Sequence, residues 1–117
     1  MNTSAESATT ENDKSDPYRI VIVEDDRSQA LFAEAILRGA GMLAEVVSAP
    51  ERLMATMEQF SPDLVLMDLH MPGTSGTTLT VQIREHPRFE QTPVVFLTGD
   101  QDPERQLEAL ELGADAF

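Results

Sequence analysis

Short segments rich in apolar residues recur along the chain at intervals that suit the strands of a buried sheet. Four of them lie at residues 20–23, 44–48, 64–67 and 94–97. The first consists of isoleucine and valine alone, and the last combines two valines with phenylalanine and leucine. Runs of this length, bounded by polar and turn residues, are typical of strands buried on both faces. We therefore predict four strands.

Helical periodicity fills the intervals between these strands. The predicted helices cover residues 27–38, 50–60, 77–85 and 103–112. In the first helix, Leu31, Ala35, Ile36 and Leu37 lie at helical spacing, and Gly39 follows as the predicted end. Pro50 suits the first position of the second helix, and Asp102 followed by Pro103 suits the start of the fourth. The apolar faces of these helices are expected to pack on the sheet.

The alternation of strands and helices indicates an α/β protein with a doubly wound parallel sheet and helices on both faces. Right-handed crossovers follow from the twist of the strands. Residues 116–117 would begin a fifth strand. Residues 1–16 carry no aromatic or β-branched aliphatic side chain, so we interpret them as a flexible tail or linker. The folded domain then covers residues 17–117.

Charge narrows the classes of partner. The 8 basic and 21 acidic side chains give a net charge of −13, and the arginines are dispersed, so direct binding to nucleic acid is not expected. No apolar run approaches the roughly 20 residues of a membrane span. The chain has no cysteine, which agrees with a cytoplasmic location and excludes disulfide and thiolate chemistry.

Acidic residues follow three of the predicted strands. Glu24, Asp25 and Asp26 come after the first, Asp68 ends the third, and Thr98-Gly99-Asp100 follows the fourth. The carboxyl ends of parallel strands meet at one edge of a sheet, where α/β proteins place their chemistry. Strands lie about 5 Å apart, so these groups are expected to share one pocket.

Several carboxylates in one pocket repel one another and favour a divalent cation. Two unit charges about 4 Å apart repel by about 4 kcal/mol at an effective dielectric constant of about 20. Ligands that are all oxygen favour Mg²⁺. A metal there could neutralise an incoming phosphoryl group while a carboxylate attacks phosphorus, with Thr98 donating its hydroxyl.

Each acidic segment by itself also has a plain structural interpretation. Asp26 is a good N-cap for the helix that follows, and the other segments resemble ordinary loops. The ring of His70 could ligate a metal, but its backbone carbonyl is the more natural ligand in a loop. Met54, Met57 and Met67 are expected in the core. The functional prediction depends on all three acidic segments falling after strands that share one edge.

At this level of detail the sequence resembles the receiver domain of two-component response regulators, over residues 18–117. The motifs that carry the resemblance are Ile-Val-Glu-Asp-Asp at 22–26, Asp-Leu-Val-Leu-Met-Asp at 63–68, Met-Pro-Gly at 71–73 with Gly76, Val-Phe-Leu-Thr at 95–98, and Leu-Gly-Ala-Asp at 112–115. The resemblance implies a flavodoxin-like fold with strand order 2-1-3-4-5. It also implies phosphorelay signalling, in which the chain phosphorylates itself from a donor rather than acting as an enzyme on other substrates.

The resemblance also assigns roles to individual residues. Asp68 would be the phosphoacceptor, while Glu24 and Asp25, together with Asp68 and the backbone carbonyl of His70, would bind Mg²⁺. Thr98 would be the switch hydroxyl, and Phe117 falls where the family has its switch aromatic. The donor would be a phosphohistidine on a sensor histidine kinase or a histidine phosphotransfer protein.

The family's phosphate-stabilising lysine has no counterpart in this chain. By the family's spacing it belongs three positions past Phe117, and Lys14 lies before the first strand. We therefore expect that strand 5 and helix 5 are largely missing and that the sequence is an incomplete receiver from a longer protein. Phosphorylation of the chain without this lysine stays open.

Two other functions remain alternatives. A phosphatase of the haloacid dehalogenase type would need an acid two residues after its nucleophile, where this chain has His70. A binding module that is never phosphorylated is the second. Residues 101–115 are similar in style to receivers attached to cyclic-di-GMP enzymes, although the same helix occurs with many output domains. The resemblance leaves the output and the oligomeric state, a dimer included, open.

Overall fold

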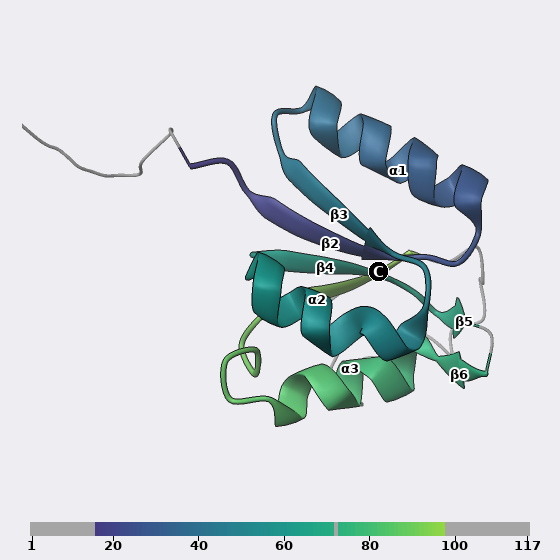
Figure 1. Ribbon diagram of the computed structural model, residues 1–117, viewed down its shortest axis with the longest axis vertical. Helices are drawn as coiled ribbons and strands as arrows, with labels where there is room; N and C mark the ends of the chain where they lie inside the picture. Colours follow the sequence, from purple (N-terminus) through teal and green to yellow (C-terminus); the bar gives the residue numbers. More distant parts are fainter. Residues whose placement is uncertain (1–15, 72, 98–117) are drawn as a thin grey trace, which may run out of the picture.

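The computed structural model describes residues 16–71 and 73–97, and the four predicted strands form one parallel sheet (Figure 1). The strands are β2 (Arg19–Val23), β3 (Leu43–Val47), β4 (Leu64–Asp68) and β7 (Val94–Leu97). Their order in the sheet is β3-β2-β4-β7, which is 2-1-3-4 when the strands are counted along the chain. The predicted α/β class and this part of the predicted order are confirmed. The helix predicted at 103–112 and the strand at 116–117 lie outside the described residues.

The register of the sheet aligns the carboxyl ends of its strands. Val23 pairs with Val47 on one side and with Met67 on the other, and Asp68 pairs with Leu97. Glu24 directly follows Val23, so the register carries it to the edge of the sheet where β4 ends at Asp68. This alignment is what the alternation of strands and helices predicted, and it places Glu24 and Asp25 beside Asp68. The third acidic segment, 98–100, lies outside the described residues.

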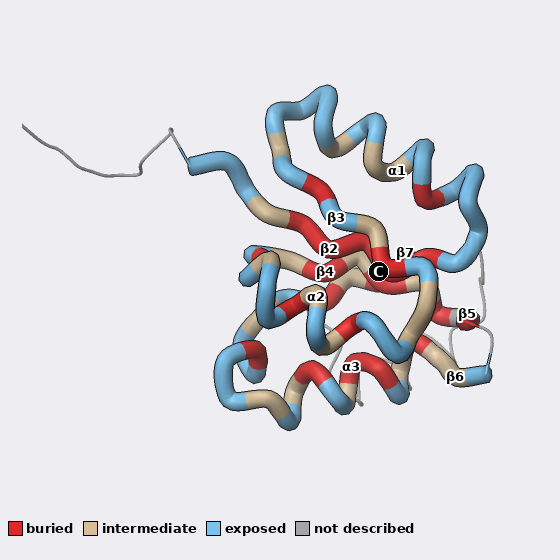
Figure 2. Tube along the Cα trace, viewed as in Figure 1, coloured by how far each residue is buried: buried red, intermediate tan, exposed pale blue. Residues whose placement is uncertain are grey.

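Helices cover both faces of the sheet, with α1 (Arg27–Gly39) on one face and α2 (Leu53–Phe60) and α3 (Gly76–Glu85) on the other (Figure 1). Alternate residues of each strand point to opposite faces. Under α2 and α3 lies the larger core, which includes Val21, Met67 and Phe96. Under α1 the buried residues are Ile20, Ile22 and Ala44. Figure 2 shows that buried segments gather in the strands between the helices. Met57 and Met67 are fully buried, and Met54 packs against the larger core, as predicted.

Helix α1 begins as predicted but ends later and buries a different face. The Asp26 side chain accepts a hydrogen bond from the Gln29 backbone N–H at 3.0 Å, which confirms Asp26 as the N-cap. The helix continues through Gly39, and the left-handed turn falls at Gly41, with φ of 87°, so the predicted end at Gly39 was early.

The apolar face predicted for this helix was right at Leu37 but wrong at Leu31 and Ile36. Leu31 and Ile36 are 49% and 55% exposed, respectively. Ala30 is buried instead, and Ala33 and Leu37 pack against the smaller core. Helical spacing alone gave no way to choose between two overlapping apolar stripes, and contact with β2 and β3 selects the narrower one.

The remaining elements complete the chain between the strands. Pro50–Arg52 form a 3₁₀ turn (η2) that leads into α2, so the predicted helix at 50–60 is in two parts. Leu79 and Ile83 of α3 are buried, as their spacing predicted. Between β4 and α3, two short strands, β5 (His70–Met71) and β6 (Thr74–Ser75), pair antiparallel, with Gly73 at φ of 75° in the turn.

Candidate functional site

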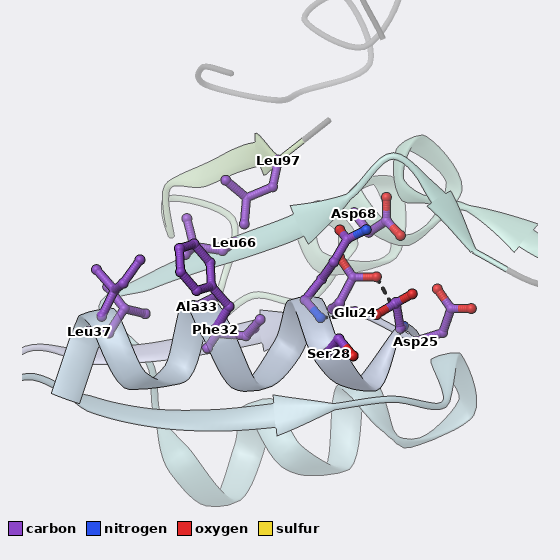
Figure 3. A pocket seen from close by; sticks show the side chains of 13 residues that line it. Glu24, Asp25, Ser28, Phe32, Ala33, Leu37, Leu66, Asp68 and Leu97 are labelled. Atoms are coloured by element: carbon purple, nitrogen blue, oxygen red, sulfur yellow. Dashed lines mark hydrogen bonds between the residues drawn. The ribbon is translucent and has the colours of Figure 1, made fainter. Parts of the chain in front are cut away.

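Three carboxylates meet at the edge of the sheet where β2 and β4 end. Glu24, Asp25 and Asp68 each offer one oxygen, and these three oxygens all lie within 4.8 Å of one another. Figure 3 shows the three side chains converging beyond the end of β4, beside the first turn of α1. The structure therefore brings together the predicted acidic pair and the predicted nucleophile, from segments more than 40 residues apart.

Glu24 is the buried member of the cluster. Glu24 is only 6% exposed, and its Oε2 atom accepts a hydrogen bond from the Asp26 backbone N–H at 3.1 Å. Burial raises the pKa of Glu24 to about 7, and the nearby Asp68 and Asp25 carboxylates add to this, while the Asp26 N–H lowers it in part. Glu24 therefore holds its proton to higher pH than an exposed glutamate.

Neither the burial of Glu24 nor its contact with the Asp26 N–H was predictable from the local sequence. A Glu-Asp-Asp segment after a strand is typical of a solvated loop, because the local sequence pattern does not indicate which of the side chains is buried. The turn between β2 and α1 determines that Glu24 is the buried side chain. Its backbone N–H donates a hydrogen bond to the Val47 carbonyl oxygen in β3 at 3.1 Å. This bond keeps Glu24 in line with the sheet after β2 has ended.

The donor chemistry of the cluster fits a hard divalent cation. Its three ligand atoms are all carboxylate oxygens, and Asp25 is exposed while Asp68 is half-buried, so the cluster remains open to solvent on one side. Burial is the main cause of the raised pKa of Glu24, and the neighbouring Asp68 and Asp25 carboxylates raise this pKa further. A bound cation would relieve the repulsion among these carboxylates.

Gly76 fixes the backbone beside Asp68, a role that we did not predict. A Cβ atom at Gly76 would lie 2.5 Å from the Asp68 carbonyl oxygen and 2.6 Å from Cε1 of Phe96. The Gly76 backbone N–H also donates to the Leu69 carbonyl at 2.8 Å. The start of α3 therefore packs directly on the end of β4, and glycine is needed because any side chain would collide with the main chain there.

An open cavity of about 1030 Å³ extends from the acidic cluster along α1. Glu24, Asp25 and Asp68 lie at one end, while Phe32, Leu37, Leu66 and Leu97 line the other, between α1 and the sheet (Figure 3). The cavity thus joins a strongly anionic end to an apolar wall.

The other predicted site residues are not tested by this structure. His70 lies in β5, where it pairs with Ser75, and its backbone carbonyl as a metal ligand stays a prediction. Thr98 and Phe117 lie outside the described residues, so their assignment as switch residues also stays a prediction.

Comparison with known proteins points to one family. The family model described as the response regulator receiver domain matches residues 20–117. An uncharacterized 76.5 kDa protein of Thiocystis violacea is 44% identical over 100 residues, which cover 86% of this chain and 14% of that protein. The transcriptional regulatory protein BaeR of Escherichia coli O6:H1 is 36% identical over 99 residues, which cover 85% of this chain and 40% of BaeR. The chain thus spans less than half the length of these relatives.

Solved structures show the same architecture. The BeF3-activated receiver domain of Klebsiella pneumoniae RstA matches with a TM-score of 0.77 and 33% identity, covering 84% of this chain and 81% of that one. The chemotaxis protein CheY4 of Vibrio cholerae matches with a TM-score of 0.81 at 23% identity, covering 86% and 83%, which shows the shared fold. Across the described part of the chain, no helix is long and apolar enough to cross a membrane.

Proposed function

The chain belongs to the response regulator receiver domain family, and on that basis we propose that Asp68 accepts a phosphoryl group from a phosphohistidine donor. Receivers of this family take part in two-component signalling through phosphorylation and are not classical enzymes. One observation carries the assignment of Asp68. It ends β4 at the rim of the sheet, and Glu24 and Asp25 offer oxygens within 4.8 Å of its own.

The proposed reaction is a displacement at phosphorus. A carboxylate oxygen of Asp68 attacks the phosphorus atom, a new P–O bond forms, and the P–N bond to the donor histidine breaks. The imidazole nitrogen leaves with the electron pair of that bond and takes a proton from solvent. The products are an aspartyl phosphate, with about two negative charges near neutral pH, and a neutral histidine.

Glu24, Asp25 and Asp68, with the backbone carbonyl of His70, would hold Mg²⁺ in this proposal. When bound, the metal supplies positive charge that offsets the charge of the phosphoryl group. Glu24 and Asp25 then act as fixed oxygen ligands, and the Asp26 N–H keeps the Glu24 carboxylate oriented. The open side of the cluster leaves room for the donor.

The signalling partners and consequences form the wider part of the proposal. The donor would be a sensor histidine kinase or a histidine phosphotransfer protein, in the cytoplasm. Thr98 and Phe117 would respond to the new phosphoryl group and change the surface read by an output domain. BaeR is named a transcriptional regulatory protein, and this supports an attached output domain without identifying one for this chain. The family assignment favours this function over the dehalogenase-type phosphatase.

Metal removal tests the proposed function directly. Incubation with radiolabelled acetyl phosphate should label the protein when Mg²⁺ is present. Excess EDTA should abolish the labelling, and added Mg²⁺ should restore it. Without the metal, the three carboxylates repel the anionic phosphoryl donor, and no positive charge in the cluster offsets that repulsion. The measurement is the bound label after rapid acid quenching and gel separation.

Two other outcomes would redirect the interpretation. Labelling that is equal in EDTA and in Mg²⁺ would contradict the metal role of Glu24 and Asp25. Binding of Mg²⁺ with no labelling at all would contradict phosphoacceptance and favour the binding module that is never phosphorylated.

The pH dependence of stability follows from Glu24. Its pKa is raised from 4.5 to about 7 in the folded protein, so folding takes up a proton at Glu24 between these values. The resulting stability is fully present below pH 4.5 and is lost as pH rises through about 7. In metal-free buffer, melting temperatures from pH 5 to pH 8 should therefore fall more for the native protein than for Glu24→Gln.

Magnesium should reverse this loss at the alkaline end. A cation binds the ionised carboxylates and therefore competes with the proton on Glu24. Mg²⁺ at about 10 mM should raise the melting temperature more at pH 8 than at pH 5. Parallel pH profiles for the native protein and Glu24→Gln would contradict the buried, protonated Glu24.

A further inference from the structure

The cavity beside Asp68 is rich in acceptors and poor in donors. Four carboxylates line it, from Glu24, Asp25, Asp26 and Asp68, and its described lining contains no lysine or arginine. Within that lining the side-chain amide of Gln29 is the one nitrogen donor. A phosphoryl group placed on Asp68 would therefore meet several like charges and few side chains able to donate to it.

Gln29 is well anchored and its side chain is available. It lies in the first turn of α1, and its backbone N–H donates to Oδ1 of the N-cap Asp26 at 3.0 Å. The next residue, Ala30, is buried and donates its N–H to the Asp26 carbonyl at 2.9 Å. Gln29 itself is exposed, and among residues 16–71 and 73–97 its amide group has no hydrogen-bond partner. The helix thus holds the backbone still while the amide stays free.

An aspartyl phosphate needs donors that the cluster lacks. Phosphorylation adds about two negative charges and three acceptor oxygens. Ionised carboxylates can only accept hydrogen bonds, so Glu24, Asp25 and Asp26 give none to these oxygens once Mg²⁺ has displaced the proton of Glu24. A neutral amide can donate two N–H groups without the desolvation cost of a charged side chain.

We propose that the side-chain amide of Gln29 donates a hydrogen bond to the phosphoryl group on Asp68, so that Gln29 is a phosphoryl-binding residue of this site. The inference rests on the proposed function, because it needs Asp68 to be phosphorylated. Ser28 lines the same cavity, but its hydroxyl is two bonds closer to the helix and is expected to contribute less. Gln29 is then the residue through which α1 detects the occupied state of Asp68.

Binding of beryllofluoride, a stable mimic of the phosphoryl group, tests this inference. Its affinity for the protein in saturating Mg²⁺ would be measured by fluorine NMR. Gln29→Leu should weaken binding about 10-fold, the size expected for one hydrogen bond to a charged group. Gln29→Glu should weaken it further through repulsion, while Gln29→Lys, which keeps a donor, should bind at least as tightly as the native protein.

The controls separate the donor role from damage to the fold or the metal site. Gln59→Leu, at an exposed position on α2, should leave beryllofluoride binding unchanged. Gln29→Leu should keep the native affinity for Mg²⁺ by calorimetry. Native beryllofluoride binding in Gln29→Leu would overturn the inference, and so would equal losses in Gln29→Leu and Gln29→Lys, since these would show that the amide does not act as a donor.

Failure of the proposed function would look different. In that case the native protein would bind beryllofluoride no better than Asp68→Asn, and both the phosphoacceptor assignment and the role of Gln29 would be refuted. Binding that depends on Asp68 but not on Gln29 would refute the role of Gln29 alone.

Discussion

Replacing Asp68 with asparagine is expected to abolish labelling of the protein by acetyl phosphate. The amide that replaces the carboxylate has no anionic oxygen to attack phosphorus, and the change removes one of the three negative charges whose oxygens lie within 4.8 Å of one another. The measurement is incorporation of radiolabelled phosphate in Mg²⁺, followed by mass spectrometry to locate the modified residue. We expect no label above background at any time point.

A matched control lies at the other end of the same strand segment. Asp63 directly precedes β4, and its carboxylate accepts a hydrogen bond from the Arg19 backbone N–H at 2.8 Å. Asp63→Asn makes the same chemical change far from the acidic cluster and should label at the native rate. Label retained in Asp68→Asn at the level of Asp63→Asn would show that another residue accepts the phosphoryl group.

Replacing Gly76 with alanine is expected to destabilise the fold by about 3 kcal/mol, as overpacking in a dense interior does. The new Cβ would lie 2.5 Å from the Asp68 carbonyl oxygen and 2.6 Å from Phe96, which is 1% exposed. Neither neighbour can move easily, because β4 and β7 pair at Asp68 and Leu97. Urea unfolding followed by circular dichroism measures the loss.

Gly39→Ala provides the comparison for this substitution. Gly39 ends α1, and a Cβ there meets nothing within 4 Å, so alanine should be neutral or stabilise the protein by up to about 1 kcal/mol. Equal urea midpoints for Gly76→Ala and the native protein would show that the loop before α3 can shift to accommodate the added Cβ with little loss of stability. The clash would then have no bearing on how Asp68 is positioned.

Much of this fold was predictable because its pattern is local. The strands at 20–23 and 94–97 are predicted by consecutive β-branched and aromatic side chains. Asp26 predicts the start of a helix because its side chain is a good N-cap. Helix α1 shows where such reasoning ends. Leu31 and Ile36 sit at helical spacing yet are exposed, because burial depends on the strands beneath the helix rather than on its own period.

The sequence alone determined that Asp68 would end a strand and that Glu24 and Asp25 would follow another. Parallel strands then bring these carboxylates to one edge of the sheet, so the candidate site was predictable before any coordinates were known. Tertiary structure decided which carboxylate is buried, since the turn after β2 directs Glu24 inward against the Asp26 N–H. It also decided that Gly76 must be glycine and that Gln29 faces the same cavity as Asp68. These properties arise from contacts between segments distant in sequence, and no local pattern carries that information.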